Sequence, residues 1–337
     1  MAKQRLDPSE VRVFSGSSHP QLAADIARYL DVPLDSTQIS RFSNDNLYIQ
    51  LGASVRGRRV YIVQSLFPPV NDHLVELLMM LDIARSAAAK DIHAIIPYFS
   101  FARSDKKDAP RISITARLIA DLLATAGATH FMTMMLHSPQ VHGFFSIPAD
   151  PLTARPVFEM YFRGRDLADA IVVAPDVGNA KSAGRFADSL GLPMAAGNKE
   201  RITDREVRIS GFVGRQVKGF KKALIYDDEV STGTSVIELS HLLVKSGIEE
   251  ISVVCTHGVF VGDALHRLNQ EGVIKEIVTT DTVDIPEEKR TSNLHVLPVG
   301  SIMGEAIRRN YHRISIEGLF VFGEEGGKPS TDWDEIT

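Results

Sequence analysis

The sequence is poor in cysteine and lacks long apolar runs. Its one cysteine, Cys255, can form neither an internal disulfide nor a cysteine-based zinc site, so we expect a reducing compartment. The first residues lack the apolar core of a signal peptide, and no stretch reaches the roughly 18 apolar residues of a membrane span. We therefore expect a soluble, cytoplasmic protein with no membrane partner.

A surplus of positive charge is also missing. The chain has 37 Lys and Arg residues against 42 Asp and Glu residues, a net charge of −5. A general nucleic-acid binder needs excess positive charge to displace counterions from phosphates. We therefore expect no nucleic-acid partner, although a local basic loop would suffice for a small anionic ligand.

The chain has 337 residues, of which 44% are hydrophobic and 23% charged, and this length is typical of about two domains. Short apolar runs alternate with helical patterns, which predicts an α/β fold with a parallel or mixed sheet. In the first half we expect strands at Val11–Phe14, Val60–Val63, Ile92–Ile96 and Phe131–Leu136, and helices at Gln21–Leu30, from a cap at Asn71 or Asp72 to Ala88, and at Thr115–Ala126.

A second half repeats this alternation, and we place the division between two similar α/β halves near residues 150–158. We expect strands at Ile171–Ala174, Lys222–Tyr226, Ile251–Thr256 and Leu294–Val296, and helices ending at Leu190 and spanning Thr234–Ser246 and Ser301–Arg309. Cys255 falls in a predicted strand, so we interpret it as a core residue.

The most informative segment follows the predicted strand 222–226. Two acids, Asp227 and Asp228, lead into a loop rich in small and hydroxyl residues that opens a helix, namely Ser231, Thr232, Gly233, Thr234 and Ser235. Ligands of open α/β sheets bind outside the carboxyl ends of strands. The amide groups of a helix N-terminus bind phosphate, and paired carboxylates accept hydrogen bonds from a sugar diol. The pattern predicts a pentose 5-phosphate site, and the alternative is a capped helix with solvated acids.

This segment resembles the ribose-phosphate motif of type I phosphoribosyltransferases and of ribose-phosphate pyrophosphokinases. The second family resembles the chain from about residue 11 to about residue 322. The other motifs that carry this resemblance are 14–19 (FSGSSH), 41–44 (RFSN), 54–57 (SVRG), 103–108 (RSDKKD), 136–137 (LH) with 143–145 (GFF), 175–176 (PD) and 199–201 (KER).

The resemblance implies two type I phosphoribosyltransferase-like α/β domains with mainly parallel sheets. They are an ATP-side domain at 7–154, completed by 311–323, and a domain at 155–310 with the ribose 5-phosphate and catalytic loops; a mobile tail follows at 324–337. The implied enzyme is a ribose-phosphate diphosphokinase of nucleotide biosynthesis. It transfers the diphosphoryl group of ATP to the 1-hydroxyl of ribose 5-phosphate.

The resemblance also assigns residues to roles. It implies that Lys199 and Arg201 are catalytic and that Arg201 contacts ribose 5-phosphate with Asp227, Asp228 and the loop 231–235. Read alone, Lys199 and Arg201 fit a solvated basic loop equally well. For ATP it implies a set of residues from three segments, namely Phe42, Asn44, Asp45, Asn46, Arg103, Ser104, Asp105 and His137. Read alone, Phe42 fits a core aromatic and Arg103–Asp105 a surface charge cluster.

Two further implications concern the metal and the quaternary structure. His137 and Asp176 each follow a predicted strand, and the resemblance implies that they bind the Mg²⁺ of Mg-ATP. Mg²⁺ prefers oxygen ligands and keeps waters, so few protein ligands suffice. The family's Phe42 loop reaches the adenine of a neighbouring subunit, which implies a homo-oligomer between dimer and hexamer.

The sequence departs from the family pattern in several places. Met135 stands where the family has an acid on the strand face of His137, Ser146 replaces a second acid, and Asn46 replaces a Glu. Ser231 and Thr234 make the phosphate loop closer to the transferase form. Two alternatives therefore remain beside the active enzyme: a non-catalytic regulatory relative, and a diphosphokinase with another donor or sugar phosphate.

Overall fold

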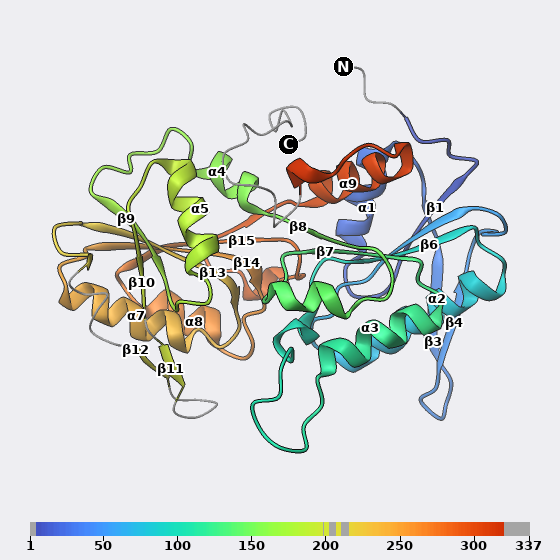
Figure 1. The fold of residues 1–337 in the computed structure, drawn as a ribbon, viewed down its shortest axis with the longest axis horizontal. Helices are drawn as coiled ribbons and strands as arrows, with labels where there is room; N and C mark the ends of the chain where they lie inside the picture. The colour runs from blue at the N-terminus through green and yellow to red at the C-terminus, as the bar shows by residue number, and fades with distance from the viewer. Residues whose placement is uncertain (1–4, 198, 202–206, 210–215, 320–337) are drawn as a thin grey trace. The chain divides into compact units, whose positions relative to one another are not determined.

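The computed structural model describes residues 5–197, 199–201, 207–209 and 216–319, and the chain divides into two compact units (Figure 1). Within the described residues, unit 1 comprises 5–153, 282–284 and 298–319, and unit 2 comprises 154–281 and 285–297. Each unit is built on a parallel sheet with helices, which confirms the expected fold class. Among the described residues, no helix is long and apolar enough to cross a membrane.

The sheet of unit 1 has six strands in the order β2-β1-β5-β6-β7-β8, and every neighbouring pair is parallel. Its central strands are buried on both faces, as parallel strands covered by helices must be. The strands are β1 (Val11–Ser15), β2 (Leu34–Asp35), β5 (Arg59–Val63), β6 (Asp91–Ile96), β7 (His130–Met134) and β8 (Ala149–Leu152).

Helices cover both faces of this sheet (Figure 1). α2 (Val70–Ser86) and α3 (Thr115–Ala126) share one apolar core with strand residues such as Ile62 and Phe131. α1 (Pro20–Leu30) and α9 (Gly300–His312) pack together on the opposite face. The short helical turns are η1 (Ser100–Arg103), η2 (Pro139–Phe144) and η4 (Glu317–Leu319).

Helix α9 packs in unit 1, whereas the sequence led us to expect residues up to 310 in the C-terminal domain. Two glycines let α9 approach α1, since a Cβ on Gly304 would lie 2.6 Å from the ring of Tyr29. The buried Glu305 then accepts a hydrogen bond of 2.9 Å from Tyr29 Oη. The last predicted strand and the last predicted helix therefore belong to different units, because residues 294–297 lie in unit 2 and α9 packs in unit 1. Residues 311–319 also fall in unit 1, and the tail 324–337 lies outside the described residues.

The sheet of unit 2 also has six parallel strands, in the order β10-β9-β13-β14-β15-β16. Cys255 is fully buried in β14 and packs in the core, as predicted. The strands are β9 (Ala170–Ala174), β10 (Met194–Ala196), β13 (Lys222–Val230), β14 (Glu250–Gly258), β15 (Ile274–Thr280) and β16 (Leu294–Leu297). The helices are α4 (Arg155–Phe162), α5 (Ala180–Leu190), α7 (Thr234–Lys245), α8 (Ala264–Gln270) and the turn η3 (Glu287–Lys289).

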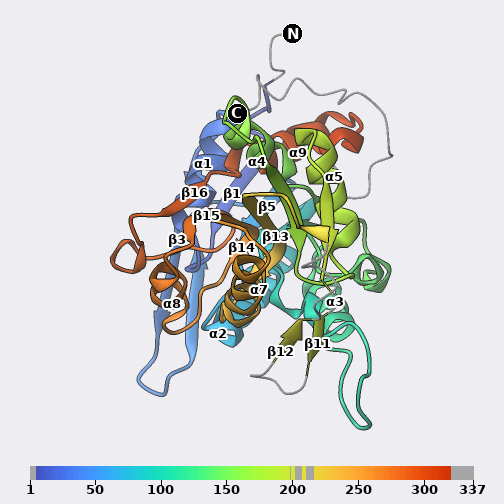
Figure 2. The same ribbon diagram turned by 90° about the vertical axis from the view of Figure 1, so that its left-hand side faces the viewer.

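The two units have the same topology. When the strands of each sheet are numbered along the chain, both sheets read 2-1-3-4-5-6. Each unit also inserts an antiparallel hairpin after its second strand. These hairpins are β3 (Thr37–Arg41) with β4 (Leu47–Leu51) in unit 1, and β11 (Lys199–Arg201) with β12 (Val207–Ile209) in unit 2. Figure 2 shows β3–β4 as a long blue ribbon extending beyond its sheet.

The predicted start of α2 was wrong. The helix begins at Val70, and its N-cap position is Pro69 in an extended conformation, where the described residues show no side-chain capping bond. Asn71 and Asp72 therefore lie inside the first turn rather than before it. The sequence reasoning also missed both hairpins, the strands β2, β8, β10 and β15, and the helices α4 and α8.

Unit 1 contains a buried histidine, His93, beside a second aromatic ring and a second histidine. His93 is 5% exposed, stacks on Tyr61 with 4.5 Å between ring centroids and lies 5.1 Å from the ring of His130. Burial lowers the pKa of His93 to about 3, and the charges of His130 and Arg59 act in the same direction. His130 itself contacts Asp150 at 2.6 Å.

We expect this group to destabilise the protein in mild acid. In the unfolded chain His93 has an ordinary pKa of about 6.5 and is protonated below that pH. In the native state it stays neutral down to a much lower pH. The contribution of neutral His93 to the free energy of unfolding is therefore complete above pH 6.5 and is lost as the pH falls towards 3. At pH 5 the loss is about 2 kcal/mol. Urea unfolding of His93→Phe should show a correspondingly smaller fall in unfolding free energy between pH 7 and pH 5. The control is the exposed His266→Gln, and equal pH slopes for all three proteins would refute this role.

Candidate active site

Strand β13 carries the predicted sugar-phosphate residues in unit 2. The sequence predicted that this strand ends at Tyr226, before the two acids. The strand in fact runs to Val230, so Asp227 and Asp228 lie within it. Both carboxylates are half-buried at the carboxyl end of the sheet. Asp227 Oδ1 accepts hydrogen bonds from the amide of Asp228 at 2.9 Å and from Asn179 Nδ2 at 3.4 Å. The carboxylate of Asp227 is thus held by the protein, and both acids are only partly exposed to solvent.

Asn179 is a site residue that sequence reasoning missed. Its Nδ2 atom also donates to the carbonyl of Tyr226 at 2.9 Å, so one amide group links two consecutive residues of β13. Its backbone amide donates to Asp176 Oδ1 at 3.1 Å. Asn179 closes the turn after β9, which lies beside β13. The signal was its place three residues after Asp176, in the segment between a predicted strand and a predicted helix.

The loop after β13 has the geometry of an anion site. Helix α7 starts at Thr234, and its N-cap Gly233 has a φ of 75°, which a residue without Cβ adopts at low cost. The described residues show no side-chain cap on this helix. The amide of Thr234 donates a long bond of 3.5 Å to Thr232 Oγ1, so the structure leaves the capped-helix alternative open. Thr232 Oγ1 lies 3.3 Å from Thr234 Oγ1, and the amide groups of the first turn lack intrahelical partners. Hydroxyls and amides together can bind a phosphate.

Strand β11 contains the two predicted catalytic cations. It pairs antiparallel with β12, with Lys199 opposite Ile209 and Arg201 opposite Val207 (Figure 2). The sequence led us to expect an extended loop, and the structure has a short two-stranded ribbon instead. The side chains of Lys199 and Arg201 lie outside the part of the chain that the structure describes.

In unit 1, the tip of the β3–β4 hairpin exposes the predicted base-stacking residue. Phe42 is 57% exposed and makes an edge contact with Tyr48, with 5.7 Å between ring centroids. The interpretation of Phe42 as a core aromatic was wrong. The amide of Phe42 donates to the carbonyl of Asn46, and Asn44 Oδ1 accepts the amide of Asn46 at 3.3 Å. The exposed tip thus presents a ring beside amide side chains.

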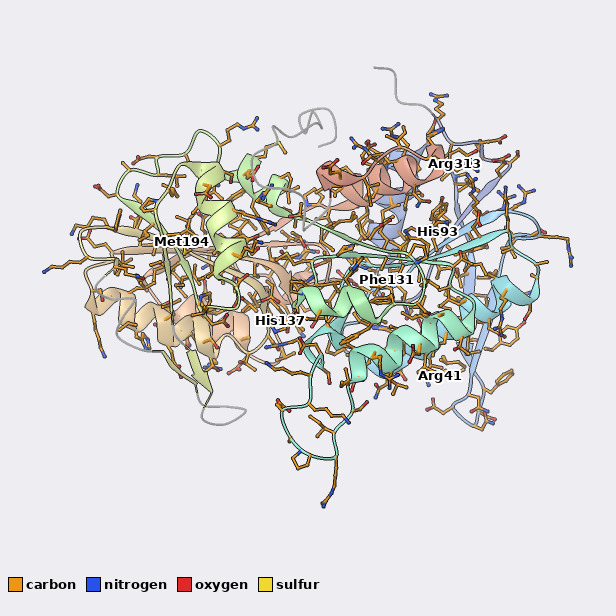
Figure 3. All side chains as sticks on the ribbon, in the orientation of Figure 1. Arg41, His93, Phe131, His137, Met194 and Arg313 are labelled. Carbon is orange, nitrogen blue, oxygen red and sulfur yellow. The ribbon has the colours of Figure 1, made fainter. Side chains whose placement is uncertain are left out.

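Arg41 holds the tip of this hairpin in shape. Its Nη1 atom donates to the carbonyl and to Oδ1 of Asp45, at 3.1 and 2.9 Å. Asp45 has a φ of 68°, a left-handed conformation that only a few side chains tolerate. Arg41 Nη2 also lies 3.1 Å from Asp72 Oδ2 on α2, which ties the tip to that helix. Figure 3 labels Arg41 at the hairpin.

The segment after β6 carries the remaining nucleotide candidates. Arg103 ends the turn η1 and is exposed, and Asp105 is half-exposed. Ser104 connects the segment to the start of α3: its hydroxyl accepts from the amide of Thr115 and donates to the carbonyl of Ser113, both at 3.4 Å, and its carbonyl accepts from the amide of Ala116. Ser104 therefore has a structural role that the sequence did not suggest.

His137 is exposed three residues beyond the end of β7, away from the buried His93 (Figure 3). The expectation that Met135 shares a strand face with His137 was wrong. The strand ends at Met134, and Met135 is 8% exposed with a φ of 49°, so side-chain alternation stops there. Asp150, four residues after Ser146, lies 2.6 Å from His130 Nε2.

The donors available for a divalent cation are few. Among the described residues, no three His, Cys, Asp or Glu side chains form a metal cluster. Asp176 is half-buried after β9 with one oxygen occupied by the amide of Asn179. A single carboxylate with one or two further protein ligands is enough for Mg²⁺, because this ion prefers oxygen ligands and usually also coordinates substrate phosphates and waters. The donor set therefore suits a metal that arrives with a nucleotide.

Comparisons with known proteins agree over nearly the whole chain. Two family models match: the N-terminal domain of ribose phosphate pyrophosphokinase over residues 11–127, and the phosphoribosyl synthetase-associated domain over residues 202–321. A Streptomyces coelicolor protein is 49% identical over 311 residues, spanning 92% of this chain and 98% of the relative. The ribose-phosphate pyrophosphokinase of Wolinella succinogenes is 41% identical over 310 residues, spanning 92% and 99%.

A solved structure supports the same assignment. The crystal structure of phosphoribosylpyrophosphate synthetase from Mycobacterium smegmatis matches with a TM-score of 0.82 and 35% identity, over 90% of this chain and 99% of that chain. The chain belongs to the ribose-phosphate pyrophosphokinase family.

Proposed function

We propose that this protein transfers the diphosphoryl group of ATP to the 1-hydroxyl of ribose 5-phosphate, giving 5-phosphoribosyl 1-diphosphate and AMP. The observation that carries the proposal is the half-buried pair Asp227 and Asp228 leading into the N-terminus of α7, where the N-cap is Gly233. The acids accept hydrogen bonds from two sugar hydroxyls, and the loop 231–235 binds the 5-phosphate.

The transfer breaks the bond between the α- and β-phosphoryl groups of ATP and forms a bond from the sugar oxygen to the β-phosphorus. The proton of the 1-hydroxyl leaves, and AMP is the leaving group. Such in-line transfers depend on positioning and on neutralising charge. In our proposal Lys199 and Arg201 neutralise the transferring group, and Arg201 also contacts the sugar phosphate.

The nucleotide is held by residues of unit 1. Phe42 stacks on the base, Asn44 and Asn46 bond its edge, and Asp45 keeps the turn in place through Arg41. Arg103, with Ser104 and Asp105, and His137 contact the phosphates or ribose. Mg²⁺, when bound to the nucleotide with His137 and Asp176, would neutralise phosphate charge. We further propose a cytoplasmic homo-oligomer, between dimer and hexamer, in which the Phe42 hairpin reaches a neighbouring subunit.

The direct test is AMP release from purified protein with Mg-ATP and ribose 5-phosphate. AMP and 5-phosphoribosyl 1-diphosphate should form in equal amounts, and only when both substrates are present. ADP formation in place of AMP would contradict diphosphoryl transfer. A non-catalytic relative would bind both substrates and release no AMP, and a related enzyme would respond to another donor or sugar phosphate.

Phe42 offers a test of the nucleotide site. Stacking of a base on an aromatic ring contributes about 1–3 kcal/mol, so Phe42→Ala should raise the KM for ATP about tenfold. Phe42→Trp should retain most of the affinity. Because Phe42 is 57% exposed, the thermal midpoint should hardly change. The matched control is Val75→Ala, another exposed apolar residue, on α2. An unchanged KM for ATP in Phe42→Ala would place the base elsewhere.

A further inference from the structure

The sugar-phosphate loop rests on helix α8, which the proposed function has not used. Gly233, the N-cap of α7, lies against Leu268, which is fully buried on α8. A Cβ added to Gly233 would come within 3.2 Å of Leu268 Cγ, and the φ of 75° already disfavours a side chain. The loop therefore has a close support on the side of α8.

The segment that leads into α8 also orients the backbone of the loop. The carbonyl of Val230 accepts from the amides of Val259 and Phe260, at 3.0 and 3.1 Å. The carbonyl of Ser231 accepts from the amide of Val261 at 3.1 Å. Two consecutive carbonyls are thus turned towards the segment 259–261.

Arg267 on α8 continues this series with its side chain. Its Nη1 atom donates to the carbonyl of Thr232 at 3.4 Å. In a trans peptide the C=O of one residue and the N–H of the next point in opposite directions. The N–H of Gly233 therefore points away from Arg267. For the same reason the N–H groups of Ser231 and Thr232 point away from the segment 259–261. A phosphate at this loop can accept from these amides together with those of the first turn of α7.

The charge of Arg267 has a second consequence. The loop 231–235 contains no basic residue and follows three acids, Asp227, Asp228 and Glu229. In the described part of the chain, Arg267 has no ion pair, and its one side-chain bond is to the Thr232 carbonyl. A guanidinium beside the loop offsets part of the repulsion that the acids exert on a dianionic phosphate.

We propose that Arg267 is a positioning residue for the sugar-phosphate loop: its guanidinium fixes the Thr232–Gly233 peptide so that the amides face the 5-phosphate. The proposal rests on the proposed function and adds to it a residue outside the loop. Arg267 acts through the peptide and does not contact the substrate. Removal of the Arg267 side chain should therefore weaken the binding of ribose 5-phosphate and leave the binding of ATP unchanged.

The experiment compares Arg267→Met, which keeps the aliphatic stem, with Arg267→Lys, which keeps a charge and a donor. The control is Lys245→Met, which removes a cation from the last turn of α7. AMP release gives kcat and both KM values, and calorimetry gives the Kd of ribose 5-phosphate without ATP at low and high salt. Thermal unfolding reports folding.

Arg267→Met should raise the KM and the Kd for ribose 5-phosphate about tenfold, as expected for one lost charge-assisted hydrogen bond. The KM for ATP and kcat should stay within about twofold of the native values. Arg267→Lys should recover at least half of the loss on a logarithmic scale, and the Kd of Arg267→Met should depend less on salt.

Three results would overturn the proposal. If Arg267→Met leaves the KM for ribose 5-phosphate unchanged while Asp228→Ala raises it, Arg267 has no positioning role and the proposed function stands. If both substrates lose affinity equally and the thermal midpoint falls, Arg267 only stabilises the fold. If the native protein neither binds ribose 5-phosphate nor releases AMP, the proposed function and this inference both fail.

Discussion

Replacing Lys199 with alanine should lower turnover by at least about 10²-fold, and Arg201→Ala should do the same. Groups that neutralise charge developing in a transition state typically contribute this much. Both residues lie on the short strand β11, whose extended backbone allows positions 199 and 201 to act on one side. The KM values for ATP and ribose 5-phosphate should change far less than kcat, since the effect arises chiefly in the transition state.

The comparison needs a control that removes the same charge elsewhere. Lys245→Ala removes a cation from the end of α7 and should leave turnover within about twofold of the native value. AMP release at saturating substrates measures kcat directly. Native turnover in Lys199→Ala would exclude its catalytic role, and a rise in both KM values at constant kcat would make Lys199 a binding residue instead.

Much of the sheet architecture could be predicted because buried parallel strands leave a clear signal. Val60–Val63, Ile92–Ile96 and Ile171–Ala174 are short apolar runs, and each lies within an observed strand. The acid pair could be placed at the carboxyl end of its strand for the same reason: four buried residues, Ala223–Tyr226, precede it. The predicted site thus followed from the contrast between a buried run and the polar residues after it.

The hairpins could not be predicted from such contrasts. In β3 and β4 only Ile49 is buried, so neither strand shows a continuous apolar run. The exposure of Phe42 follows from this geometry, and no sequence pattern distinguishes an exposed aromatic from a core aromatic. The resemblance alone drew attention to that loop. Asn179 and Arg267 were not predicted for a related reason. Each donates a hydrogen bond to a backbone carbonyl of another segment, and neither belongs to a recognisable motif.

Both units have one topology, yet unit 1 lacks a sugar-phosphate loop in the corresponding place. The loop after β5 reads Gln64-Ser65-Leu66-Phe67-Pro68-Pro69, which is bulky and contains two residues without an amide hydrogen. Nearby, the buried Glu76 accepts from the amide and hydroxyl of Ser17, at 3.2 and 2.6 Å, and from Gln64 Nε2 at 2.8 Å. A protein carboxylate thus uses the donors of the loop after β1, and the small hydroxyl residues of 231–235 distinguish unit 2.

That difference makes the acid pair of unit 2 the place for a substrate-specific effect. Asp228→Ala should raise the KM for ribose 5-phosphate by at least about tenfold. A hydrogen bond to a charged group contributes about 1.5–3 kcal/mol, and 1.4 kcal/mol corresponds to a factor of ten. Thr232→Ala should act in the same direction but less, because it removes one neutral hydroxyl. The KM for ATP should stay within about threefold in both variants. Asp227 is less suitable, since it also accepts from Asn179 and from the amide of Asp228.

The control for Asp228→Ala is Asp188→Ala, which removes an exposed acid from the last turn of α5. Its KM values should equal those of the native protein. Calorimetry with ribose 5-phosphate alone should show the same loss of affinity in Asp228→Ala as the kinetics, because the sugar diol contacts the carboxylate before any transfer occurs. An equal rise in both KM values would mean that this loop binds the nucleotide. An unchanged KM for ribose 5-phosphate would mean that the sugar phosphate binds elsewhere, since a diol bound to the acid pair would lose one of its two carboxylate acceptors.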